Sequence, residues 1–229
     1  MLFLAMTTGE MERCTKLPSH IAYFACQLSS RNPGLSNLPA QLPPKSMLII
    51  TDQIPISHHD PQKILHQVGQ LVEQFSPVGI LLDFCRQGGE GVVGALANLS
   101  CPVGVSQQYA HLTTGPVFLS PAPLCRPLER IVKPWQGRII WLDTPVCNQT
   151  VTVTPEGAAI SEFYPYSPLK SSVLHQNLGI QYTISQENEQ ITYTLSRSPN
   201  NLTPWIIHAQ KHGIEHQFCF YREFYEKSS

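Results

Sequence analysis

Short apolar segments that end in a carboxylate recur along the first two thirds of this 229-residue chain. Met47-Leu-Ile-Ile-Thr-Asp52, Val78-Gly-Ile-Leu-Leu-Asp-Phe84 and Arg138-Ile-Ile-Trp-Leu-Asp143 each predict a buried strand with Asp at or near its end. Three more strands are predicted at 20–27, 101–106 and 116–120. Short strands that follow Pro or Gly and alternate with helices indicate parallel βαβ units.

The clearest helix signal follows the strand predicted at 47–52. Asp60-Pro61 places an N-cap residue before a Pro at the first helical position. The segment that follows carries an apolar stripe at helical spacing, as expected for a helix packed on a sheet. Its members are Ile64, Leu65, Val68, Leu71, Val72 and Phe75. Further helices are predicted at 90–99, 127–135 and 201–212, the last with Gly213 as its C-cap.

The pattern changes after Asp143. Val and Thr alternate through 150–160 around Pro155-Glu-Gly157, and apolar runs at 180–184 and 191–195 flank a polar turn. Both segments predict β-hairpins, and 216–223 predicts a closing strand that ends at Glu223. Eight barrel strands can be counted when each hairpin supplies at most one. The prediction is a single α/β domain over 1–229, a small or irregular TIM-type barrel with hairpin additions in the C-terminal third; the alternative is a doubly wound open sheet.

Composition excludes several classes of partner. Charged residues make up 14% of the chain, against about 25% in an average soluble domain. The formal charge is −1, and basic residues form no run of five, so we expect no nucleic-acid partner. No stretch of about 18 uncharged apolar residues predicts a membrane span, and the apolar start at 1–6 is too short for a signal sequence. We expect a cytoplasmic protein.

The seven cysteines are odd in number and include no C-x-x-C pair, so they predict reduced thiols. This spacing supports no zinc site of the finger type. We expect no bound metal and no cofactor.

Strand-end acids are the first candidates for a functional site, because the carboxyl ends of parallel strands share one face of an α/β fold. Asp52, Asp83, Asp143 and Glu223 each end a different predicted strand and are the candidate catalytic residues. Alternation along the strands allows all four to face inward, with Asp52 on the face of Leu48 and Ile50. Barrel hydrolases use two such carboxylates, one protonated and one ionised. The competing interpretation is that these acids cap helices or hold loops.

Four neighbouring residues are candidates for ligand binding. Arg86 would bind a carboxylate or phosphate, or pair with one of the acids. Tyr109, Trp141 and Tyr221 would stack on a sugar ring, and the competing interpretation is that they fill the core.

A phosphate-binding pattern, G-x-G-x-x-G, occurs at Gly89-Glu-Gly91-Val-Val-Gly94. The acid that a dinucleotide site needs about 20 residues further on is absent, which leaves a small anion at a helix N-terminus as the alternative.

The run Gly79-Ile-Leu-Leu-Asp-Phe84 resembles a barrel strand of family-18 chitinase-type glycoside hydrolases. Their pattern on one strand is D-x-x-D-x-D-x-E, with the Glu as acid. Only Asp83 has a counterpart here, and Arg86 or Gln87 occupies the stretch where the Glu would come. The resemblance implies a barrel and a divergent member that lacks the full catalytic motif, and no catalytic role is carried over.

The leading hypothesis is a divergent barrel hydrolase, or a relative that binds a carbohydrate or small polar compound through strand-end carboxylates. The alternatives are a non-catalytic protein-interaction module on a barrel scaffold and a phosphate-ligand binder at Gly89–Gly94. Whether the chain is an enzyme, and its oligomeric state, are left open by the sequence.

Overall fold

The computed structural model describes residues 1–28, 34–52, 59–163 and 168–225. The chain divides into two compact units. The first comprises Met1, Phe3–Leu119 and Gly137–Trp141, and the second comprises Leu2, Ser120–Gln136 and Leu142–Ser229. That residues 1–229 form a single domain stays a prediction.

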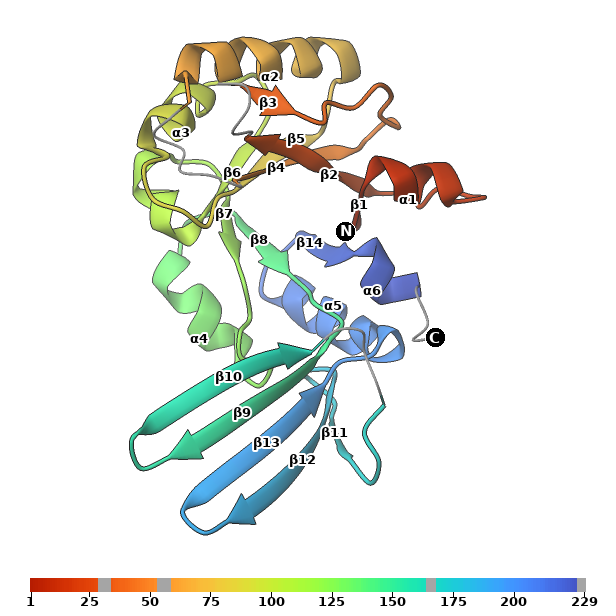
Figure 1. The fold of residues 1–229 in the computed structure, drawn as a ribbon, viewed down its shortest axis with the longest axis vertical. Coiled ribbons are helices and arrows are strands. Elements are labelled where there is room, and N and C mark those ends of the chain that lie inside the picture. Colours follow the sequence, from red (N-terminus) through yellow and green to blue (C-terminus); the bar gives the residue numbers. More distant parts are fainter. Residues whose placement is uncertain (29–33, 53–58, 164–167, 226–229) are drawn as a thin grey trace. The chain divides into compact units, whose positions relative to one another are not determined.

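Nine strands of the described chain form one sheet in the order β1-β14-β8-β7-β6-β5-β4-β2-β3, and a further pairing joins β1 to β2 (Figure 1). That pairing closes eight parallel strands into a barrel, while β3 (Leu35–Ser36) runs antiparallel beside β2. The barrel strands are β1 (Leu2–Met6), β2 (Ile21–Leu28), β4 (Met47–Asp52), β5 (Gly79–Asp83), β6 (Val103–Ser106), β7 (Val117–Leu119), β8 (Ile140–Asp143) and β14 (His216–Phe220). The predicted TIM-type barrel is confirmed, and the doubly wound open sheet is wrong.

One barrel strand differs from the sequence prediction. The hairpins of the C-terminal third contribute none, because they form a sheet of their own, and the remaining barrel strand is β1 at the start of the chain. Phe3, Leu4, Ala5 and Met6 are all buried. A strand of five residues with no turn signal before it looks in sequence like an apolar N-terminus, which is why it was missed.

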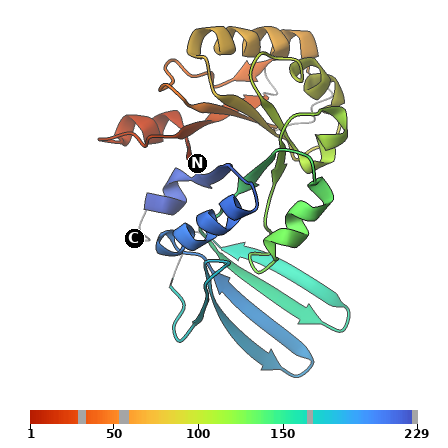
Figure 2. The same ribbon diagram turned by 180° about the vertical axis from the view of Figure 1, so that it is seen from behind.

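In the first unit, helices cover the outer side of the strands. The helix α2 (Pro61–Phe75) begins at Asp60, whose side chain accepts hydrogen bonds from the N–H groups of Gln62 and Lys63, as predicted. Figures 1 and 2 show α2 along the outside of β4 and β5. Its buried residues Ile64, Val68 and Leu71 pack with strand residues and with α3 (Glu90–Leu96) in one core cluster. The helix α1 (Thr8–Arg13) carries a capping box of Thr7 and Glu10.

The inner side of the same strands is filled by the indole ring of Trp141. A Cβ atom added to Gly104 would lie 2.4 Å from the Trp141 ring, and one added to Gly79 would lie 3.0 Å from it and 2.9 Å from Met47. Glycine at these two positions therefore makes room for one large ring inside the barrel.

The second unit contains a five-stranded antiparallel sheet in the order β10-β9-β13-β12-β11. Its strands are β9 (Asn148–Thr154), β10 (Gly157–Phe163), β11 (Val173–His175), β12 (Ile180–Glu187) and β13 (Gln190–Ser196). Both predicted hairpins are confirmed as β9–β10 and β12–β13. The helices are α4 (Leu128–Val132), α5 (Leu202–Lys211) and α6 (Tyr221–Tyr225).

Side chains divide this sheet into one apolar and one polar face, because strand residues alternate between the faces. The register places Val151 opposite Tyr193 and Tyr182 opposite Leu195 on the same face. Thr and Ser predominate on the other face, which also carries Ala159, Leu174 and Gln181. We call the first the apolar sheet face, and its members in the register are Val151, Val153, Ala158, Ile160, Val173, Ile180, Tyr182, Ile184, Ile191, Tyr193 and Leu195.

Across the described residues, no helix is long and apolar enough to cross a membrane.

Candidate functional site

Asp52 and Asp83 lie together at the carboxyl ends of β4 and β5 in the first unit. The register pairs Thr51 with Asp83, so Asp52 stands one residue beyond its neighbour. Burial raises the pKa of the partly buried Asp83 carboxyl, and the charge of Asp52 raises it further. Burial and the charge of Asp52 both favour the protonated form of Asp83.

Asp52 does not face inward as predicted. It shares its strand face with Leu48 and Ile50, and both pack in the core cluster with the α2 residues. Its carboxylate oxygens accept hydrogen bonds from the backbone N–H groups of Cys85 and Arg86, at 2.8 and 2.7 Å. Asp52 therefore holds the loop after β5, as the competing interpretation of strand-end acids proposed. Asp83 alternates with the outer-facing Leu82 and Phe84 and lies on the inner face with Gly79.

The loop after β5 is fixed from several directions. The Gln108 side-chain amide donates to the carbonyl oxygens of Phe84 and Arg86, at 2.8 and 3.1 Å. The Tyr109 hydroxyl donates to the Arg86 carbonyl and accepts from the Gly89 N–H at 3.0 Å. Arg86 is exposed, and it approaches Asp52 through its backbone N–H. The loop thus holds Cys85 and Arg86 in place beside Asp83.

Two of the predicted stacking residues lie in the core. Tyr109 is 2% exposed and packs edge-on against Phe84, with ring centroids 6.2 Å apart. Trp141 is also 2% exposed and covers Gly79 and Gly104. Neither ring offers an open face, so the core interpretation fits both better than stacking on a sugar.

The first glycine of the phosphate-binding pattern lies in the interior, at the start of α3 (Glu90–Leu96). Gly89 is the N-cap of α3, it is buried, and its N–H is bonded to the Tyr109 hydroxyl. A buried and occupied terminus leaves the phosphate alternative at Gly89–Gly94 without support.

Asp143 and Glu223 form a second acid pair, in the second unit. Glu223 does not end a strand as predicted, because β14 stops at Phe220 and Glu223 lies in α6. Its Oε2 accepts a hydrogen bond from the Val146 N–H at 3.1 Å. Burial raises the pKa of Glu223 to about 7, with a smaller contribution from the charge of Asp143. The Ser120 hydroxyl donates to Asp143 Oδ2 at 3.4 Å.

Arg197 lies near this pair and was not found from the sequence. It is fully buried, donates from Nη2 to the Leu178 carbonyl at 3.0 Å, and places its guanidinium carbon 4.4 Å from the Trp205 ring centroid. Burial lowers the pKa of Arg197 to about 10, while Asp143 raises it. The guanidinium is therefore a buried positive charge within electrostatic reach of Asp143. Only the position of Arg197 just past a predicted strand hints at this role in the sequence.

Two further groups of candidates near the acids are the cysteine thiols and Tyr221. None of the seven cysteines forms a disulfide. Burial and the charges of Asp83 and Asp52 raise the pKa of Cys85, and burial raises that of Cys219, so neither is an activated thiolate. Tyr221 begins α6, and its ring lies 4.8 Å from that of Tyr225.

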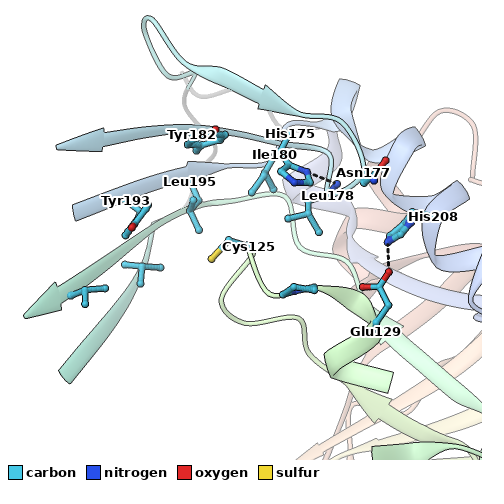
Figure 3. A pocket seen from close by; sticks show the side chains of 13 residues that line it. Cys125, Glu129, His175, Asn177, Leu178, Ile180, Tyr182, Tyr193, Leu195 and His208 are labelled. Atoms are coloured by element: carbon cyan, nitrogen blue, oxygen red, sulfur yellow. Dashed lines mark hydrogen bonds and ion pairs between the residues drawn. The ribbon is translucent and has the colours of Figure 1, made fainter. Parts of the chain in front are cut away.

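A cavity of about 540 Å³ lies in the second unit (Figure 3), and no sequence pattern predicts it. Its walls are mostly apolar and include six residues of the apolar sheet face. Opposite them lie Cys125, Pro127 and Glu129, with His208 of α5. Figure 3 shows Glu129 and His208 side by side at one edge of this cavity.

Comparison with known proteins identifies the class of fold. No protein-family model and no curated protein matches the chain. Among solved structures, the spore cortex-lytic enzyme SleL of Bacillus cereus matches with a TM-score of 0.58 at 10% identity, covering 96% of this chain and 70% of that one. A class V chitinase from Nicotiana tobaccum in complex with NAG4 matches at 0.59 and 9% identity, covering 97% and 94%.

A GH18 chitinase from Cycas revoluta in complex with (GlcNAc)4 matches at 0.56 and 10% identity, covering 95% of this chain and 94% of the other. The chain therefore has the barrel fold of the family-18 chitinases, in a divergent form. The resemblance inferred from the strand at Gly79–Phe84 is confirmed for the fold.

Counting along D-x-x-D-x-D-x-E gives the position where the Glu would come. That position is Cys85 if Asp83 matches the last Asp of the pattern, and Gln87 if it matches the middle Asp. In the first case the two earlier acids fall on Val78 and on Leu81, which is 1% exposed. The strand therefore keeps one carboxyl of the pattern, and any hydrolysis would need another acid.

Proposed function

We propose that the chain binds a carbohydrate or a similar small polar compound through partly buried carboxyl groups that end a barrel strand or lie in the helix after one. The observation that carries this proposal is the position of two half-buried carboxyl groups, Asp83 at the end of β5 in the first unit and Glu223 in α6 of the second. Burial raises the pKa of each. A protonated carboxyl donates a hydrogen bond and an ionised one accepts, so both forms suit sugar hydroxyls. The shared fold supports the choice of ligand, because two of the matched chitinases are complexes with N-acetylglucosamine tetramers.

Calorimetric titration of the full chain with the N-acetylglucosamine tetramer tests this proposal, with cellotetraose as the comparison sugar. We expect saturable binding that Asp83→Asn or Glu223→Gln weakens by about 10-fold or more, as for the loss of a hydrogen bond to a charged group. Glu189→Gln, at an exposed turn of the five-stranded sheet, is the matched control and leaves the affinity unchanged. Absence of saturable binding of either sugar, or equal losses in all three variants, overturns the proposal.

Hydrolysis of a glycosidic bond is the second candidate function, and the pKa of Glu223 favours it. A carboxyl with a pKa of about 7 is protonated over much of the neutral range and can act as a general acid beside a second carboxylate, here Asp143. Mass spectrometry of the tetramer after incubation at pH 4 to 9 would show shorter products, with a rate that falls above about pH 7. Glu223→Gln would abolish them and Glu189→Gln would not. No products at any pH contradicts this candidate.

The protein-interaction alternative requires an exposed apolar patch, and the apolar sheet face provides one. Val153, Ile160, Val173 and Ile184 are 37–58% exposed. This alternative ranks behind ligand binding because it assigns no role to the acids. A cytoplasmic location and the absence of nucleic-acid partners remain predictions from composition.

A further inference from the structure

Three side chains with metal-binding groups meet at the edge of the cavity in the second unit. Glu129 comes from the first turn of α4, and His208 and His212 lie four residues apart at the end of α5. That spacing places both imidazoles on one side of the helix. One ligand atom from each of the three residues lies within 4.8 Å of the other two.

We propose that Glu129, His208 and His212 bind one divalent transition-metal ion of the zinc class and leave a coordination position open. This site is independent of the acid pairs invoked for carbohydrate binding.

The distances support metal binding. In a tetrahedral zinc site with bonds of about 2.0–2.1 Å, neighbouring ligand atoms lie about 3.3 Å apart. His212 Nε2 lies 3.2 Å from Glu129 Oε1, and His208 Nε2 lies 3.8 Å from the same oxygen. All three donor atoms lie within 4.8 Å of one another, so one ion placed between them is near all three.

The chemistry of the donors selects the ion. Two imidazoles and one carboxylate suit Zn²⁺, Co²⁺ and Ni²⁺, whereas Mg²⁺ and Ca²⁺ prefer oxygen ligands alone. Two histidines and one glutamate are also the ligand set of open zinc sites, where a fourth position holds water or a ligand.

The competing interpretation is a surface hydrogen-bonding pair between Glu129 and the histidines. Glu129 has a side chain that is 58% exposed, and exposed ion pairs contribute little to stability. Such a pair needs one histidine, and it gives no reason for the second one to meet the same oxygen. The three-residue arrangement is explained more fully by a shared ion.

The cavity adds a second reason. Glu129 and His208 both line it, so an ion held by them would stand at its rim (Figure 3). The walls beyond are apolar and include Val151, Ile180 and Leu195. The ligand class that fits is a small compound with a metal-binding head, such as a carboxylate, and an apolar body.

The test uses the full chain, treated with a chelator and kept reduced, and titrated separately with Zn²⁺, Co²⁺, Ni²⁺ and Mg²⁺. We expect one Zn²⁺, Co²⁺ or Ni²⁺ per chain and no binding of Mg²⁺. We expect each of three variants, His208→Ala, His212→Ala and Glu129→Gln, to weaken Zn²⁺ binding by at least about 10- to 100-fold. That is the loss typical of residues that only hydrogen-bond to a metal ligand, and removal of a ligand itself costs at least as much. Zn²⁺ should raise the melting temperature of the unaltered chain and not of these variants.

His66→Ala is the matched control, since His66 is an exposed histidine on the helix α2 of the other unit. Circular dichroism of the metal-free variants checks their folding, and His212→Gln replaces any variant that does not fold. Cys125→Ser tests whether the nearby exposed thiol contributes to metal binding, and the absorption spectrum of bound Co²⁺ shows whether a thiolate is a ligand. Unchanged affinity in the His208→Ala/His212→Ala double variant, or loss of binding in Cys125→Ser alone, overturns the proposal.

Discussion

Glu223 is a carboxyl that the fold holds in an unusual setting, beside Asp143 and against the Val146 N–H. Its pKa is raised to about 7 in the folded chain, above the ordinary value of about 4.3 in an unfolded one. The folded chain therefore holds this proton more tightly than the unfolded chain does. The resulting contribution to stability is complete below about pH 4 and is lost as pH rises through about 7.

We predict that Glu223→Gln removes this dependence, because the amide cannot ionise and its oxygen can still accept from Val146. The variant should gain up to about 3 kcal/mol over the unaltered chain at pH 8 and little at pH 4. Urea unfolding at both pH values measures the difference, with Glu189→Gln as control. Identical pH profiles for Glu223→Gln and the unaltered chain would show that Glu223 is not perturbed.

Asp52 shows how far strand-end residues could be assigned from the sequence. The end of the strand was found correctly, but the direction of the side chain was not. All of Met47, Leu48, Ile49 and Ile50 are buried, because a barrel strand has a core on both sides. A run that is apolar at every position carries no alternation, so nothing in it distinguishes the inner face from the outer.

At the scale of elements, the fit of Trp141 between strands β5 and β6 gives a testable packing constraint. Gly104→Ala places a Cβ atom 2.4 Å from the Trp141 ring, and the ring is held in the buried interior. We predict a loss of about 1–3 kcal/mol in the free energy of unfolding, as for other overpacked cores. Gly94→Ala is the matched control, because Gly94 is exposed in helix α3 with nothing within 4 Å of an added Cβ.

The control should be neutral or stabilising, since Ala favours a helix by about 1 kcal/mol over Gly. Denaturant unfolding measures the free energy of unfolding of Gly104→Ala and Gly94→Ala against that of the unaltered chain. Equal stability of Gly104→Ala and the unaltered chain would mean that the ring can move aside.

The apolar sheet face carries a prediction about self-association. Val153 and Ile184 are 37% and 57% exposed on it, and exposed apolar patches promote association. We predict that this face packs against the same face of a second copy, because the exposed Val and Ile side chains of one copy offer apolar surface to the other. Val153→Thr with Ile184→Thr keeps the β-branched shape and should shift the chain toward monomer in light scattering.

Leu174→Thr is the matched control, because Leu174 is 48% exposed but pairs with Gln181 on the polar face. An equal shift in the control, or a chain that is monomeric throughout, contradicts a role for this face in association.

The elements themselves were largely predictable, and the misses have physical causes. The helix at Pro61 and both hairpins carry strong local signals in their caps, stripes and turns. The short strand at Leu2–Met6 carries none, so a count of eight strands from sequence includes strands of the hairpins in its place. The pair of His208 and His212 stands on a predicted helix, but its partner Glu129 lies 79 residues away in sequence, and no local pattern links them.

At the scale of the whole molecule, the low charge governs behaviour in solution. The chain has a formal charge of −1 at pH 7, a pI of about 6.7 and only 14% charged residues. A protein near zero net charge has little electrostatic repulsion to oppose contact between apolar surfaces. Below its pI the chain carries a net positive charge, which restores that repulsion.

We therefore predict that light scattering from the unaltered chain is strongest near pH 6.7 and falls at both pH 5 and pH 8.5. Sulfate should increase scattering at every pH, because it strengthens the association of apolar surfaces. An association caused by attraction between charges would instead weaken as salt is added. The Val153→Thr/Ile184→Thr variant should scatter less at pH 6.7, and Leu174→Thr should match the unaltered chain. Scattering that rises steadily toward pH 5 would show instead that acid unfolding, and not loss of charge repulsion in the folded chain, causes the association.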